Sequence, residues 1–177
     1  MRIISGIHKG RRITAPKRLP VRPTTDMAKE ALFNILNNTY TFDTITVLDL
    51  YSGTGNISYE FASRGSGLIT SVEADKNCVA FIKKTAEVLD MPVTAIRSNA
   101  LDYLEKTPQQ FDIIFADPPY NKPLREFEKI SEIVFQRELL KDAGTLIIEH
   151  SKKTDLSGDS HFQEDRKYGG SIFSFFQ

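Results

Sequence analysis

The segment best suited to chemistry is a short motif, Asp117-Pro118-Pro119-Tyr120, that directly follows the apolar run 111–116. An amine conjugated to a purine ring is a poor nucleophile, because its lone pair is delocalised, so an enzyme must accept hydrogen bonds from its N–H groups. Asp117 and the carbonyl group of Pro118 can supply those acceptors. Pro119 restrains the backbone, and Tyr120 can stack on a flat base. These four residues are therefore candidates for catalysis on an exocyclic amine.

A glycine turn, Gly53-Thr54-Gly55, follows an earlier apolar run, 45–50. Glycine tolerates positive φ and lets the backbone approach a ligand closely. A dinucleotide fingerprint would need glycine or alanine at position 58, and Ser58 there argues against NAD. The turn instead resembles the methionine-binding turn of S-adenosylmethionine enzymes, in which a carboxylate would lie near the charge of the cationic cofactor. The cofactor-binding candidates here are Asp49, Tyr51, Ser52, Gly53, Thr54 and Gly55.

Two polar residues follow the next two predicted strands. Glu73 ends the strand 68–73, where its carboxylate could accept hydrogen bonds from the ribose hydroxyls of the cofactor or could be an ordinary solvated acid. Asn99 follows the strand 93–98, where its amide could pair with the adenine edge, cap the next helix, or do both. With their neighbours, the predicted contacts are Glu73, Ala74, Asn99 and Ala100.

Alternating strand and helix patterns predict an α/β fold with a mostly parallel sheet. The expected strands are 45–50, 68–73, 93–98, 111–117 and 145–150, and the expected helices after the first are 56–64, 75–90, 100–106 and 123–141. The first helix should begin after Thr24 or Thr25 with an apolar face of Met27, Ala28, Ala31, Leu32, Ile35 and Leu36. Strands 161–167 and 171–176 would close the sheet as an antiparallel hairpin. This seven-stranded arrangement is the outline of a Rossmann-like class I methyltransferase.

The formal net charge of zero hides a strong asymmetry. Residues 1–25 hold seven cations and no acid, so the remainder holds 23 − 7 = 16 cations against 23 acids. Such a basic arm, with a short hairpin formed by 2–5 and 11–14, is the footprint of a nucleic-acid-binding surface, although a solvated terminus can also be basic by chance. The RNA-binding candidates among these cations are Arg2, Lys9, Arg11, Arg12 and Arg22.

Length and composition favour one domain, 1–177, with the arm 1–25 joined to a catalytic core 26–177. Cys78 is the only cysteine, and no apolar run or amino-terminal leader predicts a membrane segment or secretion. We expect a cytoplasmic monomer. The three histidines lack metal-ligand spacing, so no metal is assigned.

Several of these segments together resemble the RsmD family of bacterial 16S rRNA guanine-N2 methyltransferases. The resemblance runs nearly end to end, through segments 2–6, 9–12, 22–36, 48–55, 117–120 and 168–170. It implies S-adenosylmethionine as cofactor and, as partner, a guanine of 16S rRNA within the 30S subunit or its assembly intermediate. It also implies that the amino-terminal hairpin and the segment Arg22-Pro23-Thr24-Thr25 hold RNA near the active site, which adds Thr24 and Thr25 to the RNA-binding candidates.

Two other classes of function remain open from the sequence. One is another amino-methyltransferase, acting on adenine N6 in DNA or RNA or on a protein side-chain amide; the lack of a large target-recognition domain argues against DNA, and the basic arm argues against protein. The other is a catalytically silent RNA-binding assembly factor, against which the intact motif 117–120 argues, although fold alone never proves function.

Overall fold

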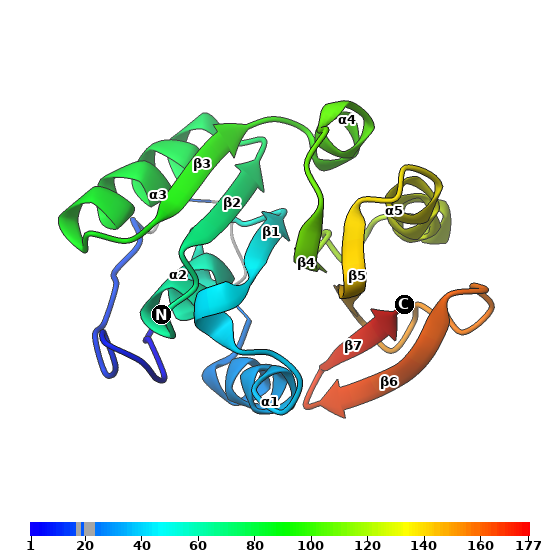
Figure 1. The fold of residues 1–177 in the computed structure, drawn as a ribbon, viewed down its shortest axis with the longest axis horizontal. Helices are drawn as coiled ribbons and strands as arrows, with labels where there is room; N and C mark the ends of the chain where they lie inside the picture. The colour runs from blue at the N-terminus through cyan, green and yellow to red at the C-terminus, as the bar shows by residue number, and fades with distance from the viewer. Residues whose placement is uncertain (17–18, 20–23) are drawn as a thin grey trace.

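A computed structural model describes residues 1–16, 19 and 24–177 of the chain. Within this part, one sheet of seven strands has the order β3-β2-β1-β4-β5-β7-β6 (Figure 1). The strands are β1 (Thr46–Leu50), β2 (Leu68–Glu73), β3 (Val93–Arg97), β4 (Phe111–Ala116), β5 (Leu140–His150), β6 (Phe162–Tyr168) and β7 (Ser171–Phe176). The first five strands are parallel to one another, and β7 pairs antiparallel to both β5 and β6. The predicted α/β fold of a Rossmann-like methyltransferase is therefore confirmed.

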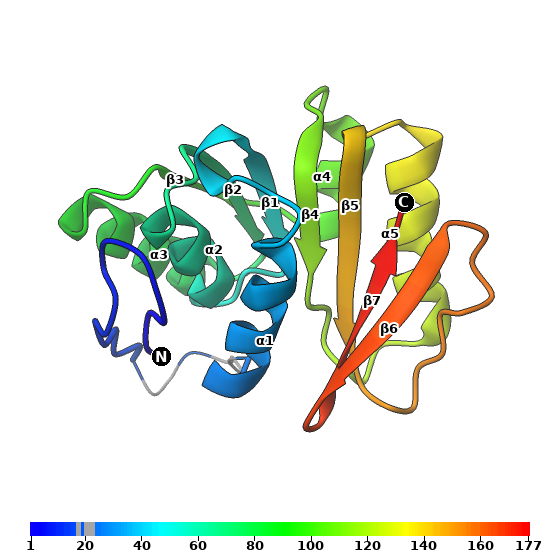
Figure 2. The same cartoon turned by 60° about the horizontal axis from the view of Figure 1, so that its bottom comes forward.

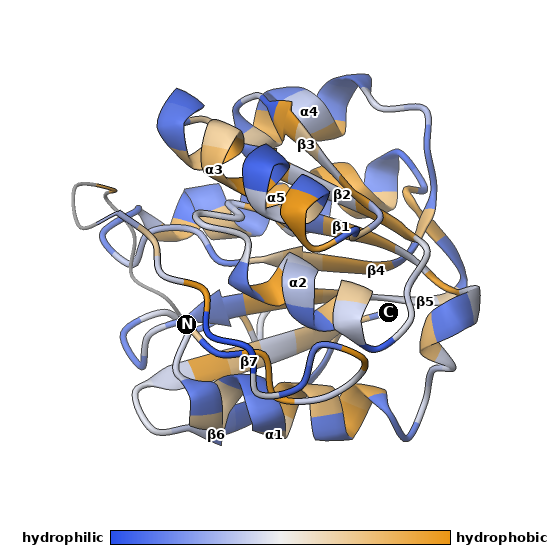
Figure 3. Ribbon diagram, turned by 90° about the vertical axis from the view of Figure 1, so that its left-hand side faces the viewer, coloured by the Kyte–Doolittle hydropathy of each residue, from blue (hydrophilic) through white to orange (hydrophobic). Residues whose placement is uncertain are grey.

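Helices cover both faces of this sheet. They are α1 (Asp26–Leu36), α2 (Asn56–Ser63), α3 (Lys76–Val88), α4 (Ala100–Lys106) and α5 (Leu124–Gln136), with a short 3₁₀ helix at Phe42–Thr44. The first three pack on one face in one hydrophobic cluster, and α4 and α5 pack on the other face in a second cluster (Figure 1). The central strands are apolar on both sides for this reason, and Figure 3 shows them as mostly hydrophobic beside helices of mixed character. No helix of the described residues is long and apolar enough to cross a membrane.

The buried face of α1 differs from the predicted one. Met27 is 61% exposed, whereas Lys29 and Phe33 are fully buried with Ala28 and Leu32. Lys29 can be buried because its ammonium group has three oxygen partners, which a hydrophobic pattern alone does not reveal. The buried stripe is therefore rotated from the apolar set read from the sequence.

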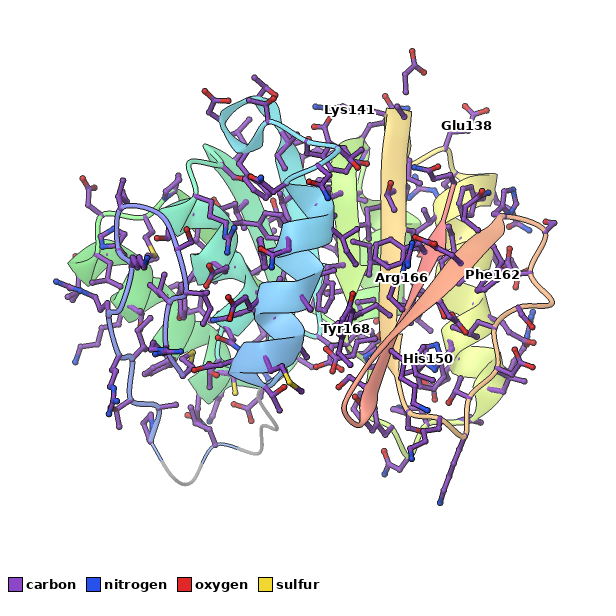
Figure 4. The ribbon with its side chains drawn as sticks, turned by 90° about the horizontal axis from the view of Figure 1, so that it is seen from below. Glu138, Lys141, His150, Phe162, Arg166 and Tyr168 are labelled. Atoms are coloured by element: carbon purple, nitrogen blue, oxygen red, sulfur yellow. The ribbon has the colours of Figure 1, made fainter. Side chains whose placement is uncertain are left out.

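The boundary between α5 and β5 also differs from the prediction of a helix over 123–141 and a strand over 145–150. The helix ends at Gln136, and Glu138 adopts a left-handed φ of 52°. The amide of Leu139 then donates to the carbonyl of Val134 at 2.9 Å, which is the bond that closes a helix of the Schellman type. The strand β5 starts at Leu140, and Figure 4 shows the labelled Lys141 near one end of the strand and His150 near the other end.

The first sixteen residues of the amino-terminal arm are docked on the rest of the protein. A single antiparallel β-bridge joins Arg2 to Arg12, so the predicted hairpin is present, but its pairing does not extend into longer strands. Its tip is held by α2, where Ser63 accepts from the amides of Ile7 at 2.8 Å and His8 at 3.0 Å. Figure 2 shows the arm alongside α2, on the side of the sheet away from the β6–β7 hairpin.

Candidate active site

The strand register brings the predicted site residues to one edge of the sheet. Leu50 pairs with Val72 on one side and with Ala116 on the other, and Ala116 pairs in turn with Ile148. The loops and side chains that follow these positions surround a cavity of about 480 Å³. Its lining includes the predicted residues Asp49, Tyr51, Ser52, Gly53, Thr54, Glu73, Ala74, Asn99, Asp117, Pro118, Pro119, Tyr120, Thr24 and Thr25. Two segments predicted independently, the glycine turn and the motif 117–120, thus face one space.

The glycine turn has the positive φ angles that its composition predicts. Gly53 and Gly55 have φ of 54° and 85°, and Gly55 precedes the first turn of α2. A Cβ on Gly55 would lie 2.7 Å from the ring of Tyr59, so this position has no room for a side chain. Tyr51 also adopts a positive φ, of 56°, which is uncommon for an aromatic residue. The turn is a closely packed backbone segment at the cavity wall.

Asp49 is buried beneath the turn. Its carboxylate accepts from the amide of Ser58 at 3.1 Å and from the hydroxyl of Ser58 at 2.5 Å, so it also satisfies the first turn of α2. Burial raises the pKa of Asp49 to about 7, and the two bonds from Ser58 oppose that rise. Asp49 lines the cavity, and a cation bound nearby would stabilise the ionised form of its carboxylate.

Glu73 is oriented by backbone amides. It accepts from Gly53 at 2.9 Å and from Asp75 at 2.9 Å, one amide to each carboxylate oxygen. These bonds tie the glycine turn to the end of β2 and hold the carboxylate at the cavity. Asn99 caps α4 by accepting from the amide of Leu101 at 3.0 Å, and it also lines the cavity. Both the capping role and a ligand contact are compatible with its position.

The motif 117–120 lies between the ends of β4 and β5. The amide of Asp117 donates to the carbonyl of Leu50 at 3.4 Å, which places the motif directly beside the strand that leads to the glycine turn. Pro118 is buried and Pro119 is exposed. The hydroxyl of Tyr120 points to Glu149 and Ser171, at 3.0 Å and 3.1 Å. Burial raises the pKa of Tyr120, so its phenol stays protonated and able to donate.

Sequence reasoning missed several residues of this cavity, above all Glu149 near the carboxyl end of β5. Glu149 is only 2% exposed and lines the cavity together with Ser171 from β7. One signal was available: a carboxylate directly after the apolar run Leu146-Ile147-Ile148, near the edge where parallel sheets bind ligands. The other lining residues that were missed are Asn56, Ile57, Asp75, Cys78, Phe115 and Lys122.

The cavity is strongly acidic. Among the described residues that line it, the acids are Asp49, Glu73, Asp75, Asp117 and Glu149, and the only cation is Lys122. Such a lining suits a ligand with positive charge, whereas a pyrophosphate group would be repelled. The acidic lining therefore fits S-adenosylmethionine, which carries a sulfonium and an ammonium group, better than a dinucleotide.

Some predicted site residues lie elsewhere. Gly55 and Ala100 support the turn and α4 without lining the cavity. The side chains of Lys9, Arg11 and Arg12 are exposed on the arm, and Arg2 lies 3.3 Å from Asp26. Arg22 falls outside the described residues.

Comparison with known proteins gives a consistent result. The model of the family described as "Conserved hypothetical protein 95" matches residues 1–177. "Ribosomal RNA small subunit methyltransferase D" of Buchnera aphidicola (subsp. Acyrthosiphon pisum) is 33% identical over 156 residues, which are 87% of this chain and 80% of the relative. The chain belongs to the RsmD family.

Two further comparisons extend over nearly the whole length of this RsmD-family chain. YlbH of Bacillus subtilis is 30% identical over 177 residues, which are 96% of this chain and 94% of that protein. The solved structure of yhhF from Escherichia coli superposes with a TM-score of 0.84 at 25% identity, covering 100% of this chain and 97% of that one. Family and fold make the chain a methyltransferase, and they imply a cofactor of the S-adenosylmethionine type.

Proposed function

We propose that this protein transfers a methyl group from S-adenosylmethionine to the exocyclic N2 amine of a guanine in 16S rRNA. The observation that carries the proposal is the shared cavity, because its lining includes both the glycine turn with Glu73 and the motif 117–120. The relatives named small subunit methyltransferase D support the choice of ribosomal RNA as the substrate.

The cofactor would be held by the acidic and backbone groups of the cavity. Glu73 would accept from the ribose hydroxyls, Asn99 and Ala100 would adjoin the adenine, and the turn 51–55 with Asp49 would face the methionine part. When bound, S-adenosylmethionine supplies an electrophilic methyl group. Gly53 keeps its amide on Glu73, so that carboxylate is oriented before any ligand arrives.

The target amine would be bound by the motif. The Asp117 carboxylate and the Pro118 carbonyl would accept from its two N–H groups, which favours a pyramidal nitrogen with an available lone pair. Tyr120 would stack on the base. The amine becomes acidic as it gains the methyl group, so Asp117 can receive the released proton directly or through water. A base presented in this way must be unpaired or flipped out of its helix.

The amino-terminal arm would hold the RNA outside the cavity. Its exposed cations Lys9, Arg11 and Arg12 can contact phosphates, and Arg2, Arg22, Thr24 and Thr25 are further proposed contacts. We infer that residues 1–177 act as one domain, with 1–25 as the RNA-holding arm and 26–177 as the core. A monomer acting in the cytoplasm on the 30S subunit or its assembly intermediate completes the proposal.

The test is methyl transfer from labelled S-adenosylmethionine. The substrates are 30S subunits and naked 16S rRNA from cells lacking this gene, with mature 30S subunits and duplex DNA as controls. We expect label only in the two hypomethylated substrates or one of them, recovered as N2-methylguanosine. Label in DNA, in adenine or in protein would contradict the proposal.

Replacing Asp117 by alanine should abolish this transfer, because the amine loses its carboxylate acceptor. A decrease of at least about a thousandfold is expected if Asp117 provides both positioning and proton acceptance. Cofactor binding and the thermal unfolding midpoint serve as controls and should change little, since Asp117 is partly exposed. Full complementation of a deletion strain by Asp117→Ala would instead support a catalytically silent assembly factor.

A further inference from the structure

Glu149 is a buried carboxylate that the chemistry above does not use. One of its oxygens accepts from Ser171 Oγ at 2.7 Å and from the Tyr120 hydroxyl at 3.0 Å, and the other accepts from Thr24 Oγ1 at 2.8 Å. None of the ion pairs among the described residues includes Glu149. Three hydroxyl groups therefore take the place of water around this carboxylate.

These hydroxyls come from separate parts of the fold. Thr24 precedes α1, Tyr120 follows β4 and Ser171 begins β7, while Glu149 adjoins His150, whose position at the end of β5 is seen in Figure 4. A charge-assisted hydrogen bond is stronger and more directional than a neutral one. The direction of the Tyr120 side chain is thus set by a carboxylate on a neighbouring strand as well as by its own loop.

The same carboxylate is connected to the docked arm through buried polar groups. The backbone carbonyl of Thr24 accepts from the side-chain nitrogen Nδ2 of Asn56 at 3.1 Å, and Asn56 Oδ1 accepts from Lys29 Nζ at 2.9 Å. Lys29 in turn lies 3.2 Å from Glu60, whose carboxylate accepts from two amides of the arm, those of Ile4 and Ser5. Glu60 and Lys29 are completely buried, so this chain of bonds runs through the interior.

We propose that Glu149 is a positioning residue that fixes Tyr120 at the substrate end of the cavity and anchors it to the elements that carry the amino-terminal arm. The inference rests on the proposed function, since Tyr120 is taken to stack on the target base. Tyr120 contacts the substrate, and Glu149 acts through it. The RNA-holding arm and the base-holding tyrosine are consequently parts of one rigid framework.

The test combines Glu149→Gln, Tyr120→Phe and the double variant. Glutamine keeps the shape and an acceptor oxygen but removes the charge, and phenylalanine keeps the ring but removes the hydroxyl. Each single change should lower kcat for rRNA by about tenfold or more, with the dissociation constant of S-adenosylmethionine within about twofold of wild type. Glu149→Gln weakens the bond from Tyr120 to residue 149 and Tyr120→Phe removes it, so both changes act on the same bond and the double variant should be no slower than the slower single variant.

Tyr40→Phe is the matched control, because its hydroxyl bonds the same strand far from the cavity, at Ala143 and Thr145. It should leave kcat unchanged. A Tyr120→Phe enzyme as fast as wild type, or effects of Glu149→Gln and Tyr120→Phe that multiply in full, would overturn the inference.

A second measurement needs no RNA. Amide hydrogen exchange at Tyr120, Asn121 and Lys122 should speed up in both single variants and no further in the double variant, because the loop loses its anchor. Unchanged exchange would also overturn the inference. If wild-type protein methylates no rRNA while exchange behaves as expected, the proposed function fails and the positioning of Tyr120 by Glu149 stands.

Discussion

Three buried or partly buried carboxylates at the site are each held by neutral donors. Asp49 is bound by Ser58, Glu73 by backbone amides, and Glu149 by hydroxyls. None of these donors is a cation, so the negative charge of the cavity is only partly compensated by its surroundings. A cationic ligand would offset more of this negative charge. Protonation of a single carboxylate should therefore change the affinity for the cofactor.

The pH dependence of cofactor affinity should follow Asp49. Its pKa rises on folding from 3.8 to about 7, chiefly by burial. The folded protein therefore holds a proton that the unfolded chain releases, and the contribution of Asp49 to stability falls as pH rises through that interval. A cationic ligand favours the ionised form, so affinity for S-adenosylmethionine should weaken by up to about tenfold per unit as pH falls below about 7.

Calorimetry with wild-type protein and Asp49→Asn across this pH range would check the prediction. Asparagine does not titrate, so its pH dependence should be flat. A wild-type affinity that is equally flat would show that Asp49 does not sense the ligand's charge.

At the level of elements, docking of the arm on α2 depends on close backbone contact at Gly6. Gly6 and Gly10 have nearly the same positive φ, of 83° and 82°. A Cβ on Gly6 would lie 1.7 Å from the carbonyl oxygen of Ser63, whereas a Cβ on Gly10 would have nothing within 4 Å. An alanine would therefore meet the same backbone strain at both positions, but it would clash with a neighbouring segment only at position 6.

Gly10→Ala should lower the free energy of unfolding by about 1 kcal/mol, from strain alone. Gly6→Ala should lower it by about 1–3 kcal/mol more, because the arm must move away from Ser63, and it should weaken RNA binding. Denaturant unfolding of the two variants measures the difference. Equal free energies would mean that the arm is not held at this contact.

At the level of the whole molecule, charge is divided between an acidic cavity and a basic arm. The exposed Arg11 and Arg12 form no ion pair with any described residue, and they lie on the arm that Figure 2 shows beside α2. This division would keep the two proposed ligands apart, because a polyanion is attracted to the arm and a cation to the cavity.

Changing Arg11 and Arg12 together to alanine should weaken RNA binding and reduce the slope of log affinity against log salt by about 1.4 to 1.8, since each phosphate contact contributes about 0.7–0.9. Affinity for S-adenosylmethionine should stay the same. The matched control is Lys106→Ala with Lys129→Ala, on α4 and α5 at the opposite face of the sheet, and it should leave the slope unchanged. Equal slopes for the wild type, the Arg11 and Arg12 variant and the control would show that the arm does not contact RNA phosphates.

The sequence alone determined the order of strands and helices, the glycine turn and the motif 117–120, because those features depend on local periodicity and on residues adjacent in the chain. Only the tertiary structure decided that Lys29 is buried and that Glu149 holds Tyr120. Each of these results depends on contacts between distant segments, such as the bond from Thr24 to Glu149 across 125 positions. No local pattern encodes such a contact, because the energy of a buried charge depends on which partners the whole fold brings to it.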